Sequence, residues 1–164
     1  MSAQPLATGE FVVERDDPRR PDVRAVLERH LAFCRATSPP EDVHALDLDG
    51  LVAPDVSFFS LRSDGTVLGV GALKRLGDDH VEIKSMHTLV EARGRGVARA
   101  MLAHLLGAAR ELGARLVSLE TGSQKEFAPA RRLYANAGFV ETGPFADYRE
   151  SPNSTFMTRD VEAA

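Results

Sequence analysis

The chain has 164 residues, of which 43% are hydrophobic, and a formal net charge of −4, a composition that suits a single globular domain with one core. The acidic balance argues against a nucleic-acid-binding protein, because such proteins carry an excess of Lys and Arg over one face. A single cysteine cannot form an intrachain disulfide, the first residues lack a secretion signal, and no apolar run reaches the roughly 20 residues that cross a bilayer. We therefore expect a cytoplasmic protein that binds neither nucleic acid nor membrane, with a flexible N-terminus over residues 1–9 and a single domain over residues 10–162.

The first half of the chain predicts one long helix and several β-strands. Apolar residues recur at helical spacing after Pro21, and Pro39 and Pro40 end that pattern. The turn residues Ser63-Asp64-Gly65 predict a hairpin, and Gly77-Asp78-Asp79 predict a second tight turn. The expected elements are a strand over 11–14, a helix from 21 to about 36, a short helix within 41–51, and strands over 56–62, 66–76 and 80–88.

The second half alternates helices with strands. Because a strand–helix–strand crossover is right-handed, the strand over 116–120 is predicted to lie parallel to the strand over 80–88. The expected elements are helices from 97 to about 113 and from 129 to about 138, a strand from 139, and an antiparallel edge strand over Ser154–Arg159. The predicted fold is α+β: a mixed, mostly antiparallel central sheet of about six to seven strands with a splayed parallel pair, flanked by about four helices.

A phosphate-binding loop is predicted where the strand over 80–88 leads into the helix that follows. The segment reads Arg93-Gly94-Arg95-Gly96-Val97-Ala98. Its glycines have no Cβ to keep an anion from the main chain, so N–H groups converge on it at the positive end of the helix dipole, and the arginines add charge. The splayed strands beside this loop expose backbone groups to which an amide-rich arm can add itself. Coenzyme A, with a diphosphate and a peptide-like arm, fits this description.

Two motifs carry a resemblance to a known family. Arg93-Gly94-Arg95-Gly96-Val97-Ala98 matches Arg/Gln-x-x-Gly-x-Gly/Ala, and Leu133-Tyr134-Ala135-Asn136-Ala137-Gly138-Phe139 matches Leu-Tyr-x-x-x-Gly-Phe. Both are signatures of the GNAT superfamily of N-acetyltransferases, which the chain resembles over roughly residues 11–160; shorter segments are similar to a bacterial subgroup typified by YsnE. Phe127 departs from the family pattern by replacing a frequent asparagine, and Thr88 replaces a usual β-branched apolar residue.

The resemblance implies transfer of an acetyl group from acetyl-CoA to a primary amine of a small or amino-acid-like molecule, by direct attack in a ternary complex. An N–H group at a strand bulge bracketed by Met86, His87 and Thr88 would stabilise the thioester oxygen. Tyr134 would donate a proton or hydrogen bond to the departing thiolate. The attacking amine, with a pKa of about 10, must first lose a proton.

Two carboxylates compete for the role of general base. Glu82 lies near the position of the base in relatives, and Glu120 ends the neighbouring parallel strand; Glu120 is also a candidate partner for the substrate ammonium. Further expected substrate contacts are His44 and Tyr148, the latter in a substrate-facing loop over residues 145–154. We expect no metal site, because His44 has no second His or Cys at ligand spacing.

Alternatives remain open from the sequence alone. Glu82 is also consistent with a solvated edge charge paired with Lys84 or Arg75, and Tyr134 with a core tyrosine. Cys34 has no partner pattern for a nucleophile. The chain as a whole is also consistent with a non-catalytic acyl-CoA binding or sensing module, and exposed strand edges are compatible with a homodimer.

Overall fold

The computed structural model describes residues 11–43 and 47–161. The predicted flexible segment 1–9 and the predicted substrate contact His44 lie outside these residues. The strands are β1 (Phe11–Arg15), β2 (Val56–Ser63), β3 (Thr66–Arg75), β4 (His80–Thr88), β5 (Leu116–Gly122), β6 (Val140–Thr142) and β7 (Ser154–Asp160). The helices are α1 (Pro21–Thr37), α2 (Leu48–Leu51), α3 (Val97–Glu111) and α4 (Ala128–Asn136), with short 3-10 turns η2 (Pro40–Asp42), η3 (Val90–Ala92) and η4 (Lys125–Phe127).

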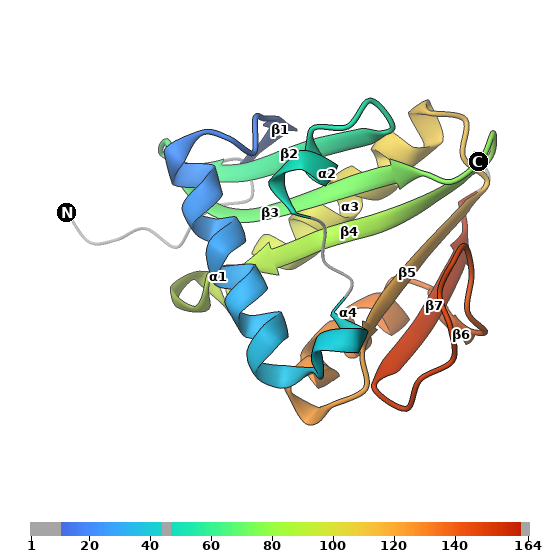
Figure 1. Ribbon diagram of the computed structural model, residues 1–164. Helices are drawn as coiled ribbons and strands as arrows, with labels where there is room; N and C mark the ends of the chain where they lie inside the picture. The colour runs from blue at the N-terminus through green and yellow to red at the C-terminus, as the bar shows by residue number, and fades with distance from the viewer. Residues whose placement is uncertain (1–10, 44–46, 162–164) are drawn as a thin grey trace.

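One sheet of seven strands runs through the described residues in the order β1-β2-β3-β4-β5-β7-β6. The β4–β5 pair is parallel, with a register from His80 opposite Leu116 to Ile83 opposite Leu119. Both strands continue beyond Ile83 and Leu119 without pairing to each other, so they diverge toward their carboxyl ends (Figure 1). This confirms the predicted α+β fold and its splayed parallel pair.

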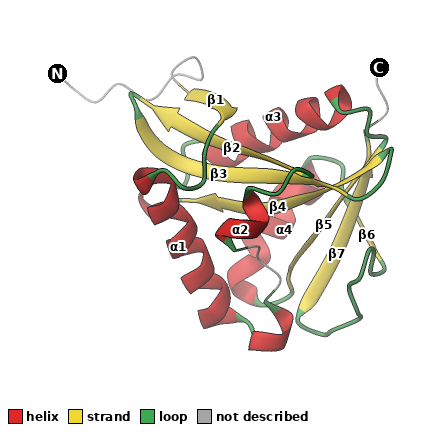
Figure 2. Ribbon diagram, turned by 45° about the horizontal axis from the view of Figure 1, so that its top comes forward, coloured by secondary structure: helices red, strands yellow, loops and turns green. Residues whose placement is uncertain are grey.

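Helices cover the two faces of β3 and β4. Figure 2 shows α1 on one side of these strands and α3 on the other. α3 buries an apolar stripe against the sheet, and Gly71 of β3 allows its close approach, because a Cβ there would lie 3.1 Å from Leu105 Cδ1 and Met101 Cγ. The core therefore forms on both faces of β3 and β4, and β4 is one of the two strands that diverge.

The structure confirms one detail of the sequence-based expectations and corrects another. The short helix expected within 41–51 is present as α2, and the Asp47 side chain begins it by accepting a 2.9 Å hydrogen bond from the Gly50 N–H. β7 is antiparallel as expected but is not the edge strand, because β6 pairs along its outer side. β6 is three residues long with an exposed Val140, a short edge that offers little surface for further pairing.

No helix in the described parts of the chain is long and apolar enough to span a bilayer.

Candidate active site

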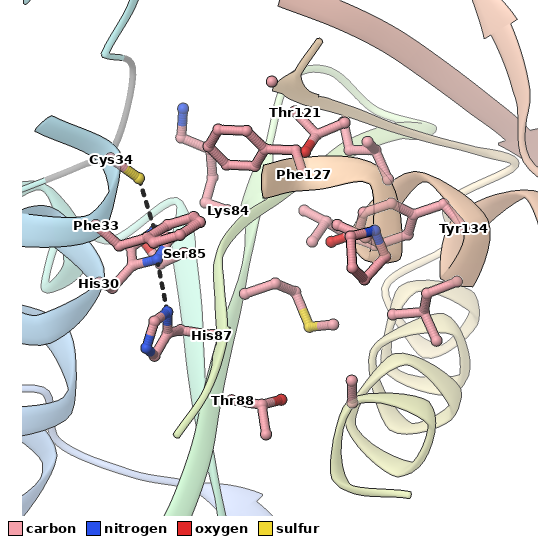
Figure 3. A pocket seen from close by; sticks show the side chains of 18 of the residues that line it. His30, Phe33, Cys34, Lys84, Ser85, His87, Thr88, Thr121, Phe127 and Tyr134 are labelled. Carbon is pink, nitrogen blue, oxygen red and sulfur yellow. Dashed lines mark hydrogen bonds between the residues drawn. The ribbon is translucent and has the colours of Figure 1, made fainter. Parts of the chain in front are cut away.

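A cavity of about 690 Å³ opens where β4 and β5 diverge. Side chains from α1, β4, β5, η4, α4 and the loop before α3 line it, together with Tyr148 from the β6–β7 connection. In Figure 3, Phe33 and Cys34 enter from α1, Thr88 lies farther along β4, and Tyr134 enters from the opposite side. The cavity thus brings together residues more than 100 positions apart.

The predicted phosphate loop forms one end of this cavity. Gly94 and Gly96 have φ values of +78° and +84°, and a Cβ at either position would have no atom within 4 Å. Gly96 is the N-cap of α3, so the first N–H groups of that helix face the loop. Five of the six predicted residues line the cavity; Arg95 is exposed and is not among the lining residues. Left-handed glycines, empty space and helix N–H groups together fit the diphosphate of coenzyme A.

The strand bulge lies slightly earlier than the predicted bracket. Between Val70 opposite His87 and Ala72 opposite Lys84, β4 has two residues where β3 has one. Those two residues are Ser85 and Met86, and Ser85 has φ of +58°. Sequence reasoning placed Met86, His87 and Thr88 around the bulge but missed Ser85, whose buried Oγ has no hydrogen-bond partner among the described residues. All four residues line the cavity.

The His87 side chain turns toward α1. Its Nδ1 lies 3.2 Å from Nδ1 of His30, and Cys34 Sγ lies 3.8 Å from the other ring nitrogen of His30, as the dashed lines in Figure 3 mark. Burial lowers the pKa of His30 to about 3 and that of His87 to about 4. Both imidazoles are therefore neutral near pH 7 and carry no positive charge.

Tyr134 is buried on α4, and its ring packs edge-to-face against Phe139 at 5.7 Å between centroids. The two aromatic residues of the Leu-Tyr-x-x-x-Gly-Phe motif therefore support each other. Tyr134 also lines the cavity. Because burial raises the pKa of Tyr134 well above its ordinary value, the hydroxyl keeps its proton at any physiological pH.

Glu82 is buried in a three-member polar cluster. The Tyr148 hydroxyl donates a short hydrogen bond to Glu82 Oε2, Lys84 Nζ lies 3.3 Å from that same oxygen, and Lys84 Nζ donates to the Tyr148 oxygen at 2.8 Å. Glu82 is only 3% exposed. The expected pairing with Lys84 is therefore present, but in the interior rather than at a solvated edge. Arg75 instead donates to backbone carbonyls.

Glu120 lies near the end of β5 on the same face of the sheet as this cluster. The parallel register sets Glu82 opposite Ser118, so the next residues on that face are Lys84 and Glu120. Glu120 is partly buried and lines the cavity. Burial raises the pKa of Glu120 to about 7, and the negative charges of Glu82 and Asp42 contribute to the rise. A carboxylate with this pKa exchanges protons readily near neutral pH.

Sequence reasoning missed how the β6–β7 connection is held. Asp42 of η2 accepts 3.0 Å hydrogen bonds from Ser151 Oγ and from Asn153 Nδ2. A second hollow of about 940 Å³ lies along this connection, and Asp42, Glu82, Lys84 and Tyr148 line both hollows. No local sequence signal links Asp42 to residues more than 100 positions away.

The Cys34 thiol is not a reactive thiolate near pH 7. Burial raises the pKa of the Cys34 thiol to about 11, and the Glu120 carboxylate contributes. Within residues 11–43 and 47–161, no group of three His, Cys, Asp or Glu side chains is placed to hold a metal ion.

The chain matches known proteins along most of its length. A model of the acetyltransferase (GNAT) family matches residues 23–139. The uncharacterized N-acetyltransferase YsnE of Bacillus subtilis (strain 168) is 43% identical over 149 residues, which cover 91% of this chain and 99% of YsnE. The uncharacterized N-acetyltransferase YedL of Escherichia coli (strain K12) is 41% identical and covers 90% of this chain and 93% of its own length.

Solved structures share the fold. A protein of Klebsiella pneumoniae subsp. pneumoniae described as an acyl-CoA N-acyltransferase has a TM-score of 0.76 at 24% identity, covering 92% of this chain and 97% of its own. The yncA protein of Salmonella typhimurium, solved with acetyl-CoA, has a TM-score of 0.70 at 20% identity, covering 94% and 96%. With the family match and the two close relatives, these findings establish that the chain belongs to the GNAT family and is an N-acetyltransferase.

Proposed function

We propose that this N-acetyltransferase uses acetyl-CoA to acetylate the primary amine of a small molecule, by direct attack while both substrates are bound. The observation that carries the proposal is the position of Glu120, a carboxylate with a pKa of about 7, in the same cavity that the phosphate loop closes at its other end. A proton acceptor and a cofactor-binding loop that share one cavity suit a ternary complex.

Acetyl-CoA is proposed as the acyl donor because the backbone at residues 93–98 fits its diphosphate. Gly94 and Gly96 keep the anion's space clear, and Arg93 and Arg99 line the same end of the cavity. The unpaired ends of β4 and β5 offer backbone groups to the amide-rich arm. The cofactor would supply an acetyl group activated as a thioester.

The acidic and basic roles divide between Glu120 and Tyr134. Glu120 takes a proton from the ammonium form of the acceptor. The neutral amine nitrogen of the acceptor can then form a bond to the acetyl carbon as the carbon–sulfur bond breaks. The Tyr134 hydroxyl, kept protonated by burial, donates to the departing sulfur. The backbone N–H groups at the Ser85–Met86 bulge are the proposed donors to the thioester oxygen. Glu82 is a less suitable base, because Tyr148 and Lys84 already occupy its carboxylate.

The proposal is tested by measuring free CoA thiol release from acetyl-CoA across a panel of primary amines. We expect thiol release that depends on the amine and starts without a lag. Mass spectrometry should identify a single product, the N-acetyl amine. Release that does not depend on any amine would contradict the proposal, because water would then be the acceptor. Tight acetyl-CoA binding with no turnover would also contradict it and would favour an acyl-CoA sensing module.

A further inference from the structure

Three aromatic rings surround the face of the sheet that carries Glu120. Phe127 covers Gly122 so closely that a Cβ on Gly122 would overlap its ring. Gly122 is two residues after Glu120 on β5, so Phe127 lies over the same face as the carboxylate. The ring of Phe33 on α1 contacts that of Phe127 edge-to-face at 5.2 Å between centroids.

Tyr148 completes this aromatic wall. Its ring lies 5.5 Å from that of Phe156, the β7 residue paired with Glu120. Phe33, Phe127 and Tyr148 all line the cavity, and the rings of Phe33 and Phe127 lie next to each other in Figure 3. A molecule that presents an amine to Glu120 therefore rests its body against aromatic surface.

The cation beside this wall is already paired. Lys84 is bound to Glu82 and to Tyr148. Among the described residues, no Lys or Arg forms an ion pair with Glu120. A carboxylate on the acceptor would thus have to break the Glu82–Lys84 pair to find a cation, at the cost of leaving a buried charge unpaired.

From these contacts we infer that the acceptor is an apolar, aromatic primary amine: an ammonium for Glu120, a ring for the wall of Phe33, Phe127 and Tyr148, and no carboxylate. This inference rests on the proposed function and narrows it. Amino acids are excluded as good acceptors because the Lys84 cation beside Glu120 is already bound to Glu82 and Tyr148. Polyamines are poor acceptors because they bring no ring to the aromatic wall.

The test compares four amines at saturating acetyl-CoA. 2-Phenylethylamine is the probe, phenylalanine adds a carboxylate to the same skeleton, butylamine removes the ring, and spermidine adds cations. We expect kcat/KM for 2-phenylethylamine to exceed kcat/KM for butylamine and for spermidine by about tenfold, because both lack the ring. It should exceed kcat/KM for phenylalanine by about 100-fold or more, because of the added carboxylate.

Variants locate the preference in the aromatic wall. Phe33→Ala should raise KM for 2-phenylethylamine about tenfold and leave kcat/KM for butylamine within about twofold. Phe33→Leu, which keeps most of the volume, provides a second measurement if the alanine variant is unstable. Val140→Ala, on the exposed edge strand, is the control and should change neither amine.

The possible outcomes separate this inference from the proposed function. Faster turnover of phenylalanine or spermidine, or an equal loss for both monoamines in Phe33→Ala, would overturn the inference while leaving amine acetylation intact. Binding of acetyl-CoA without acetylation of any of the four amines or of a broader panel would overturn both.

Discussion

The two ends of the cavity are built in different ways. At the cofactor end, a continuous segment from Arg93 to Ala98 supplies glycine backbone and the N-terminus of one helix. At the acceptor end, side chains from α1, η2, β4, β5, η4 and the β6–β7 connection meet around Glu120. One end is a local backbone structure, proposed to bind the diphosphate of acetyl-CoA, whereas the other is assembled by the tertiary fold.

This difference has consequences for substitution. The cofactor end depends on φ values that glycine alone adopts cheaply, so it should be sensitive to any side chain. The acceptor end depends on charge and on ring contacts, so conservative changes there should alter chemistry and specificity while acetyl-CoA binding survives.

The largest effect is expected for Glu120→Gln. The amide has nearly the same shape but cannot accept the acceptor's proton, so kcat/KM should fall by about 10² to 10⁴. Calorimetric titration should show an unchanged Kd for acetyl-CoA. Glu82→Gln is the matched control; if it caused the greater loss, Glu82 rather than Glu120 would be the base.

Tyr134→Phe should mainly lower kcat, by about 10²-fold, because the ring packing on Phe139 remains while the proton donor to the leaving sulfur is lost. KM for the amine and Kd for acetyl-CoA should change little. Steady-state kinetics with direct thiol detection measure both. An unchanged kcat would mean that Tyr134 has a packing role only.

Gly96→Val should weaken acetyl-CoA binding about tenfold or more, because it places a side chain in the phosphate loop and disfavours the φ of +84°. Gly113→Val is a closely matched control: Gly113 also has φ of +84° and open space around its Cβ position, but it follows the opposite end of α3. Both variants should lose similar thermal stability. Equal Kd values for the two variants would place the diphosphate elsewhere.

The smallest predicted effect is a shift in pH dependence. The Glu82 carboxylate raises the pKa of Glu120, so Glu82→Gln should lower that pKa and extend activity to more acidic pH. We expect the acid limb of kcat/KM to move down by less than about one pH unit. Movement of the limb to higher pH would contradict the proposed charge arrangement.

The same contrast explains what could be predicted from the sequence. The conformation of the glycine loop and the helix after it were predictable because their signals lie within a few residues, in the glycines at 94 and 96 and the apolar stripe that follows. The parallel crossover was predictable from element order and handedness. The position of β7 was not, because no local signal shows whether the strand expected from 139 or the strand over 154–159 pairs with β5.

The acceptor end was only partly predictable. Both carboxylates were identified, but the proposed preference for Glu120 rests on the contacts of Glu82 with Tyr148 and Lys84, which depend on the tertiary fold. Asp42 carried no signal, since its partners Ser151 and Asn153 are distant in sequence. Phe127 was visible only as a departure from the family's asparagine; its contact with Phe33 required the fold.

The central claim is that Glu120 accepts the proton of the amine. Its most direct test is the pH profile of kcat/KM for the wild-type chain and for Glu120→Gln with the same amine. The account predicts that wild-type kcat/KM rises with pH through a midpoint near 7, where Glu120 loses its proton, and that this step is missing in the variant, leaving only the ionisation of the amine. A step near pH 7 that persists in Glu120→Gln would contradict the account.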